Sequence, residues 1–87
     1  MHCNIRLANE GDLKYIYRFI CALEDNLFDQ TLFESIFNKN IHHKDYYYYI
    51  AESDGNIIGY ISCHTQYLLH HCGKVAEIQE LFVEASF

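Results

Sequence analysis

Two acids lie within a largely apolar stretch near the C-terminal end of the sequence, AEIQELFV at residues 76–83. The stretch predicts a strand, in which successive side chains point to opposite faces. Strict alternation places Glu77 and Gln79 on one face and Glu80 on the other, unless a bulge intervenes. A carboxylate buried in a central strand has a raised pKa, which suits it to accept a proton from an amine near neutral pH. An edge strand with solvated acids explains the same pattern equally well.

His64 is a second candidate, because it lies within another predicted strand with Ser62 and Gln66 on the same side. A lone histidine on a strand is more often structural than functional. Together with His70 and Cys72, His64 could also supply the nitrogen and sulfur ligands that zinc prefers. Their spacing matches no common zinc motif, so we expect no metal ligand here.

The elements that must position these residues follow from apolar periodicity and capping signals. Asn9 can cap a helix over residues 11–24, and Asp29 precedes a second helix that ends near residue 40. The pair Asp54-Gly55 between two β-rich segments predicts a hairpin. Strands are expected at residues 3–8, 46–53, 57–67 and 75–83. The order β-α-α-β-β-β, with the last three strands antiparallel, predicts an α+β fold of the α/β-sandwich type.

Composition limits the partners and the compartment. The chain has 87 residues and a formal net charge of −6, and its basic residues are scattered. Phosphate binding needs clustered cations, so we expect no nucleic-acid partner. No apolar run approaches the length of about 20 residues that a membrane span needs, and the N-terminus does not resemble a signal peptide. We expect a cytoplasmic protein with no membrane partner, whose four cysteines are reduced and buried.

Three segments in this order resemble the first half of the GNAT superfamily of acetyl-CoA-dependent N-acetyltransferases. They are IRLANEGDLKYIYRFICALE near the start, YIAESDGNIIGYISCH in the middle and AEIQELFVEASF at the end. A narrower resemblance is carried by FDQTLFESIFNKNI followed by HTQYLLHHCGKVAEIQEL. These segments are similar to bacterial aminoalkylphosphonate N-acetyltransferases, which acetylate small primary amines.

The resemblance implies a twisted mixed sheet whose fourth strand binds the pantetheine arm of acetyl-CoA. The matching backbone contacts are those of Leu81, Phe82 and Val83. Glu77 matches the general base, directly or through a water, and His64 and Gln79 match residues that bind the acceptor amine or shuttle protons. The implied reaction is direct acetyl transfer without an acyl-enzyme, with a strand amide near Leu81 polarising the thioester carbonyl.

The family continues from this strand into a pyrophosphate-binding loop at a helix N-terminus. The sequence stops where that loop is expected, so we interpret residues 1–87 as the N-terminal part of a single GNAT domain that is incomplete alone. The last strand would then present an exposed edge, which favours a homodimer or other self-association. The alternative function is a non-catalytic, GNAT-like half-domain that acts as a binding or self-assembly module.

Overall fold

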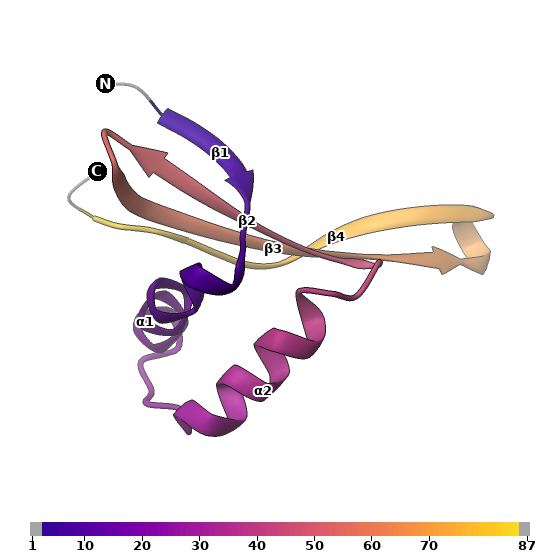
Figure 1. Cartoon of the computed structure of the whole chain (residues 1–87). Helices are drawn as coiled ribbons and strands as arrows, with labels where there is room; N and C mark the ends of the chain where they lie inside the picture. The colour runs from indigo at the N-terminus through magenta and orange to yellow at the C-terminus, as the bar shows by residue number, and fades with distance from the viewer. Residues whose placement is uncertain (1–2, 86–87) are drawn as a thin grey trace.

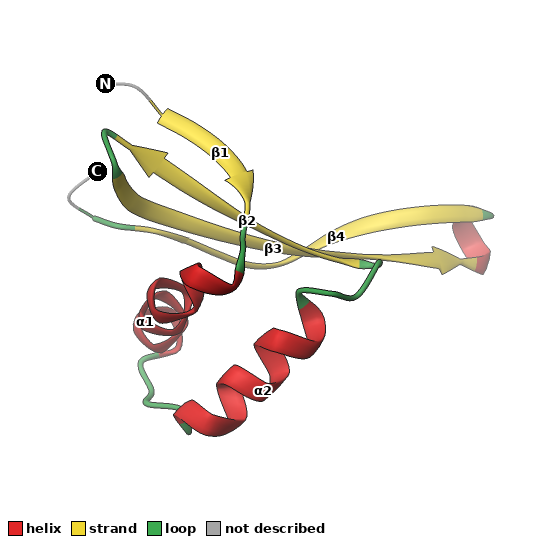
Figure 2. Cartoon of the chain, in the orientation of Figure 1, coloured by secondary structure: helices red, strands yellow, loops and turns green. Residues whose placement is uncertain are grey.

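The computed structural model describes residues 3–85. Their elements, in order, are β1 (Cys3–Leu7), the 3-10 helix η1 (Glu10–Asp12), α1 (Leu13–Glu24), α2 (Gln30–Asn40), β2 (Tyr46–Ser53), β3 (Asn56–Leu68), the 3-10 helix η2 (Leu69–His71) and β4 (Gly73–Val83). The strands form one sheet in the order β1-β2-β3-β4, and every neighbouring pair is antiparallel. Both helices lie on the same side of this sheet (Figures 1 and 2). The predicted element order and α+β class are confirmed.

The first helical segment is fixed by a capping box. Asn9 accepts a hydrogen bond from the Gly11 amide (2.9 Å), and Asp12 accepts one from the Asn9 amide (2.8 Å). The helix expected from residue 11 therefore opens with the 3-10 turn η1, and α1 follows it. Asp12 also binds both terminal nitrogens of Arg6 (2.7 and 2.8 Å), so the cap links α1 to strand β1. These contacts satisfy helix-terminal N–H groups that would otherwise lack partners.

The second helix begins as expected, since Asp29 caps it by accepting a hydrogen bond from the Leu32 amide (2.8 Å). Its apolar residues divide into two groups. Phe37 is buried against the sheet, and its ring stacks on that of Tyr48. Leu32 and Ile36 belong to the same apolar stripe by their spacing along the helix, but they are 61% and 51% exposed. Only one edge of this apolar stripe therefore faces the sheet.

The core lies between the helices and the middle strands. Its fully buried apolar members come from α1, α2, β2 and β3, and are Ile16, Phe19, Ile20, Phe37, Ile50 and Tyr60. Strand β4 joins this core through Phe82, whose ring stacks on Phe19 with centroids 5.0 Å apart. That contact fixes β4 relative to the helix layer.

The β2–β3 hairpin turns at Asp54-Gly55, as predicted. Both residues have positive φ angles (51° and 83°), which the two central positions of a type I′ turn require. Beyond the last β2–β3 pair, Tyr46 with His64, strands β3 and β4 continue together as a two-stranded arm. The arm, residues 65–76, extends away from the helices and ends in η2 (Figure 1).

The cysteine prediction is only partly right. None of the four cysteines forms a disulfide, but Cys3 and Cys72 are exposed, and Cys21 and Cys63 are only half-buried. Cys3 lies on an edge strand and Cys72 follows η2 at the end of the arm, so neither position is covered by the helices. Within residues 3–85, no helix combines the length and apolar character needed to cross a membrane.

Candidate functional site

A bulge in β4 changes which acids share a face. Ser62 of β3 is paired with Glu80, but the next residue, Cys63, is paired with Ile78, so Gln79 is the extra residue. His64 is then paired with Glu77. Because directly opposed residues point to the same side of a sheet, Glu77 and Glu80 lie on one face, together with Ser62 and His64. Strict alternation, which separated Glu77 from Glu80, is therefore wrong for this strand.

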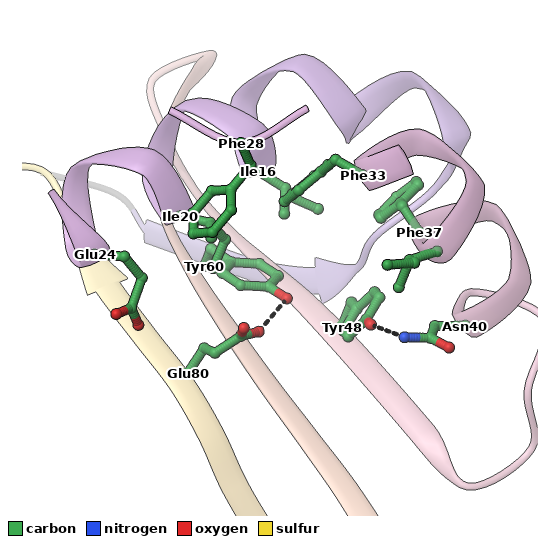
Figure 3. Close-up of a pocket in the computed structure, with 11 residues that line it drawn as sticks. Ile16, Ile20, Glu24, Phe28, Phe33, Phe37, Asn40, Tyr48, Tyr60 and Glu80 are labelled. Atoms are coloured by element: carbon green, nitrogen blue, oxygen red, sulfur yellow. Dashed lines mark hydrogen bonds between the residues drawn. The ribbon is translucent and has the colours of Figure 1, made fainter. Parts of the chain in front are cut away.

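Glu80 is held by two hydroxyl groups of β3. Ser62 Oγ donates to Glu80 Oε1 at 2.7 Å. Tyr60 Oη donates to the same oxygen at 3.1 Å (Figure 3). Burial, with the nearby Glu80 charge as a smaller cause, raises the pKa of Tyr60 above its ordinary value. The Tyr60 hydroxyl therefore stays protonated near neutral pH and remains a donor. Within residues 3–85, no hydrogen bond to Glu80 Oε2 is seen and no cation pairs with this carboxylate.

The Glu80 carboxylate lies at a cavity of about 360 Å³ between the helix layer and the sheet (Figure 3). The helices contribute apolar walls that include Ile20, Phe33 and Phe37. The sheet contributes the polar side, where Tyr48 accepts a hydrogen bond from the Asn40 amide nitrogen (2.8 Å). Burial also raises the pKa of Tyr48, so its hydroxyl is neutral in the physiological range. The result is a largely apolar cavity with a single acid on its sheet side.

A second, more polar cavity of about 220 Å³ adjoins the first and shares Asn40, Tyr48 and Glu80 with it. Two residues predicted from the sequence, His64 and Gln79, line this second cavity. The ring of His64 also packs edge-on against Tyr46, with centroids 5.8 Å apart. The structure therefore brings His64 and Gln79 together beside Glu80.

Glu77 is among the lining residues of neither cavity. It is half-buried at the base of the arm, directly opposite His64 in the sheet register. Its Oε1 accepts a hydrogen bond from the Gln66 amide nitrogen at 2.8 Å. The predicted base is thus near the predicted histidine, but it is held by a neutral amide outside the cavities.

The backbone of β4 alternates between its partner strand and an open edge. The Glu84 amide donates to the Ile58 carbonyl of the preceding hairpin strand (2.8 Å). Because N–H groups along an antiparallel strand point alternately to either side, the amides of Leu81 and Val83 point away from β3. Among residues 3–85, no strand pairs with that side of β4. Phe82, by contrast, directs its backbone toward β3 and its ring onto Phe19.

The histidine and cysteine residues near the arm do not converge. Among residues 3–85, no group of three or more His, Cys, Asp or Glu side chains is placed to hold a metal ion. His70 and His71 belong to η2, where their ring centroids are 4.3 Å apart, and Cys72 follows them with a positive φ. His64 is on β3 at the base of the arm, away from its tip.

The residues that sequence reasoning missed are Glu80 as the acid at the cavity, with its partners Tyr60 and Ser62, and the pair Tyr48 and Asn40. The spacing of Tyr60 and Ser62 by two residues, opposite an acid-bearing strand, was the available signal. It becomes useful only once the β3–β4 register is known.

Comparison with known proteins gives the family. The model of the acetyltransferase (GNAT) family matches residues 13–87. An aminoalkylphosphonate N-acetyltransferase of Salmonella typhimurium (strain LT2) is 37% identical over 81 residues, which are 93% of this chain and 53% of that protein. The chain therefore spans about half the length of this curated relative.

Solved structures agree with this match at the level of the fold. The crystal structure of a possible acetyltransferase from Clostridium difficile 630 aligns with this chain at a TM-score of 0.84 and 17% identity. The alignment covers all of this chain and 60% of the Clostridium difficile chain. The structure of a predicted acetyltransferase with acetyl-CoA from Clostridium acetobutylicum aligns with this chain at a TM-score of 0.76 and 18% identity. The alignment covers 98% of this chain and 62% of the Clostridium acetobutylicum chain. With its element order, sheet topology and 75 C-terminal residues all matching, this chain belongs to the acetyltransferase (GNAT) family.

Proposed function

We propose that this chain is part of an acetyl-CoA-dependent N-acetyltransferase that moves an acetyl group directly to a small primary amine. The observation that carries the proposal is the placement of Glu80 on β4, where its carboxylate lines a cavity and the next residue, Leu81, opens its backbone to the strand edge. One strand can thus contact an amine on one side and an extended acyl carrier along its edge. Membership of the family supports this assignment.

The edge of β4 fits the pantetheine arm of acetyl-CoA, which is linear and carries amide groups that pair like a strand. Leu81 and Val83 would supply the pairing backbone groups, and the Leu81 amide would donate to the thioester carbonyl. Phe82, the third position matched by resemblance, would act through its ring, which holds β4 on α1. Acetyl-CoA supplies the activated acetyl group. A preorganised strand amide at the carbonyl is the kind of donor that contributes most to such reactions.

Glu77 is the proposed general base, acting directly or through a water. Its support is its position opposite His64 and on the same face as Glu80. His64 and Gln79 line the polar cavity and would bind the acceptor or pass its proton to Glu77. The name of the Salmonella relative makes an aminoalkylphosphonate one candidate for the acceptor, to be compared with other small primary amines.

The test of the base is Glu77→Gln in the protein as its gene encodes it. We expect turnover to fall by about 10²–10⁴-fold, the usual contribution of a positioned base, and the acidic limb of the pH–rate profile to move. Glu34→Gln is the matched control, because Glu34 is an exposed acid on α2 and lines neither cavity beside β4. An unchanged pH–rate profile in Glu77→Gln would remove Glu77 from the mechanism.

Residues 1–87 are proposed to be the N-terminal part of a single GNAT domain. The coverage of about half to two-thirds of the matched proteins supports this. Calorimetric titration with acetyl-CoA tests it. The 87-residue chain is expected to bind weakly, and a protein that includes the following pyrophosphate-binding segment is expected to bind tightly. Micromolar binding by the 87-residue chain alone contradicts this division.

The alternative function, a self-assembly module, is favoured by one observation. The open-edge strand β4 carries exposed apolar side chains at Ile78, Leu81 and Val83, with exposures of 63%, 55% and 56%. A homodimer that pairs two β4 edges would satisfy the open backbone groups and place these side chains beside their counterparts on the partner strand. Sedimentation of the 87-residue chain should then show a dimer that Leu81→Lys disrupts, whereas a concentration-independent monomer argues against assembly.

A further inference from the structure

The larger cavity has a chemical character that the family assignment does not specify. Two carboxylates, Glu24 and Glu80, are among its lining residues, and none of its lining residues is a lysine, arginine or histidine. Glu24 is exposed at the end of α1, whereas Glu80 is half-buried and fixed by two hydroxyl groups. The cavity therefore has the electrostatics of a site for a cation.

We propose that this cavity binds the ammonium group of a primary amine whose body is apolar, and that it disfavours amines carrying an anionic group. Glu80 is the ammonium anchor, and the aromatic and aliphatic side chains of the helix layer surround the body of the ligand. The inference rests on the proposed function, because the bound amine would be the acetyl acceptor.

The geometry at Glu80 supports an anchoring role. Tyr60 and Ser62 both donate to Oε1, which fixes the orientation of the carboxylate. The other oxygen, Oε2, makes no hydrogen bond within residues 3–85, and is the atom left to accept from an ammonium. A half-buried carboxylate without a cationic partner is costly, and a bound ammonium would offset that cost.

The walls of the cavity set the size and polarity of the ligand body. A volume of about 360 Å³ is at the small end of the range for ligand sites, which suits a compact molecule. Phe28, Phe33 and Phe37 present aromatic surface, and Ile16 and Ile20 present aliphatic surface. Aromatic faces attract an ammonium, and burial of an apolar body against such walls is favourable.

The same walls disfavour a phosphonate. A doubly charged anion would lose its hydration in an apolar cavity and would lie near Glu80 without a positive partner among the lining residues. The geometry therefore points away from the acceptor that gives the Salmonella relative its name. The preferred acceptor has an ammonium at one end and carbon at the other.

Binding to the 87-residue chain is measured by calorimetry with three probes that share a two-carbon linker. These are 2-phenylethylamine, 2-aminoethylphosphonate and 2-phenylethanol. We expect the first to bind at least tenfold more tightly than either of the others. Glu80→Gln keeps the shape of the side chain and removes its charge, so it should weaken the binding of 2-phenylethylamine at least tenfold. Glu34→Gln should leave the affinity for 2-phenylethylamine unchanged. Equal or tighter binding of 2-aminoethylphosphonate, or an unaffected Glu80→Gln, overturns the proposal.

A second measurement does not depend on the variant folding. Intermolecular NOEs from bound 2-phenylethylamine should reach ring protons of Tyr60 and Phe37, which line the cavity. NOEs to Tyr67 of the arm, which is 78% exposed, or no NOEs to the cavity at saturating probe, would also overturn it.

Acetylation assays on the protein as its gene encodes it separate this inference from the proposed function. A higher kcat/KM for 2-aminoethylphosphonate than for 2-phenylethylamine would contradict this inference and would be consistent with the proposed function. Tight 2-phenylethylamine binding that requires Glu80, without acetylation of any amine, supports the cavity assignment and sinks the proposed function.

Discussion

The two ends of the β3–β4 ribbon have different surroundings. At one end, β4 lies under α1, and Phe82 stacks on the fully buried Phe19. At the other end, the arm at residues 65–76 extends beyond both helices (Figure 1). Leu69, in η2, is 99% exposed. The hydrogen-bond partners of the two acids of β4 differ between these ends. Glu80 at the covered end has two hydroxyl donors and a cavity, whereas Glu77 at the base of the arm has one amide donor.

This contrast shows that the helix layer, more than the strand sequence, determines what each acid can do. Both acids occur on the same strand and the same face of the sheet. Only at the covered end do the helices supply apolar walls beside the acid. Apolar walls lower the local dielectric, which strengthens the interaction of a carboxylate with a cation. Three pairs of substitutions compare the helix-covered part of the molecule with the arm and its base.

The largest effect is expected from Phe19→Ala. Removal of a fully buried ring that contacts Phe82 should lower the free energy of unfolding by about 3–5 kcal/mol. The matched substitution in the arm, Leu69→Ala, should change it by less than about 0.5 kcal/mol, because Leu69 is exposed. Urea denaturation followed by circular dichroism measures both. Similar losses for the two variants would contradict the distinction between the ends.

Asp12→Asn is expected to have the next largest effect. Asp12 is buried, and its hydrogen bonds with Arg6 hold the pKa of the Asp12 carboxyl below its ordinary value. Loss of these charged hydrogen bonds should cost about 1.5–3 kcal/mol at neutral pH. Glu77→Gln, which alters one bond to a neutral amide, should cost less than about 1 kcal/mol.

The pH dependence of the Asp12→Asn effect follows from the direction of the shift. A lowered folded-state pKa stabilises the protein fully above the unfolded-state pKa of about 3.9 and progressively less as the pH falls through the folded-state value. The stability difference between the natural chain and Asp12→Asn should therefore be constant above about pH 5 and shrink below about pH 4. A difference that grows on acidification would show that Asp12 is not the ionised partner.

The smallest effect is expected from Tyr60→Phe. It removes one of the two donors to Glu80 and keeps the buried ring, so the free energy of unfolding should fall by about 1 kcal/mol. Tyr67→Phe is the matched arm variant, and its exposed hydroxyl should contribute almost nothing. The same urea titrations resolve the pair. A larger loss for Tyr67→Phe would reverse the ranking of the two ends.

Local signals in the sequence predicted most of the fold. Asn9 and Asp29 cap the helices as expected, and Asp54-Gly55 makes the expected hairpin. These features depend on residues within a few positions of one another, and so they can be read from a single segment. The exposure of Leu32 could not be predicted in this way, because the apolar stripe of α2 is wider than the part of the helix that the sheet covers.

The candidate site was less predictable because it depends on register. His64 and Gln79 do lie together, but Glu80, which the sequence placed on the opposite side from Glu77, is the acid at the cavity. No glycine or other local signal marks the bulge at Gln79. It becomes visible only in the pairing of β4 with β3, which is a contact between distant segments.

The extra residue at Gln79 has a consequence for how insertions and deletions would act on this strand. It changes the parity of β4, so that two acids at an odd separation behave as if the separation were even. Deletion of this one residue would restore regular pleating and make the separation of Glu77 and Glu80 even, so both acids would stay on the same face of the sheet. Loss of the bulge without a deletion would instead shift the residues before it by one position and turn Glu77 to the face opposite Glu80.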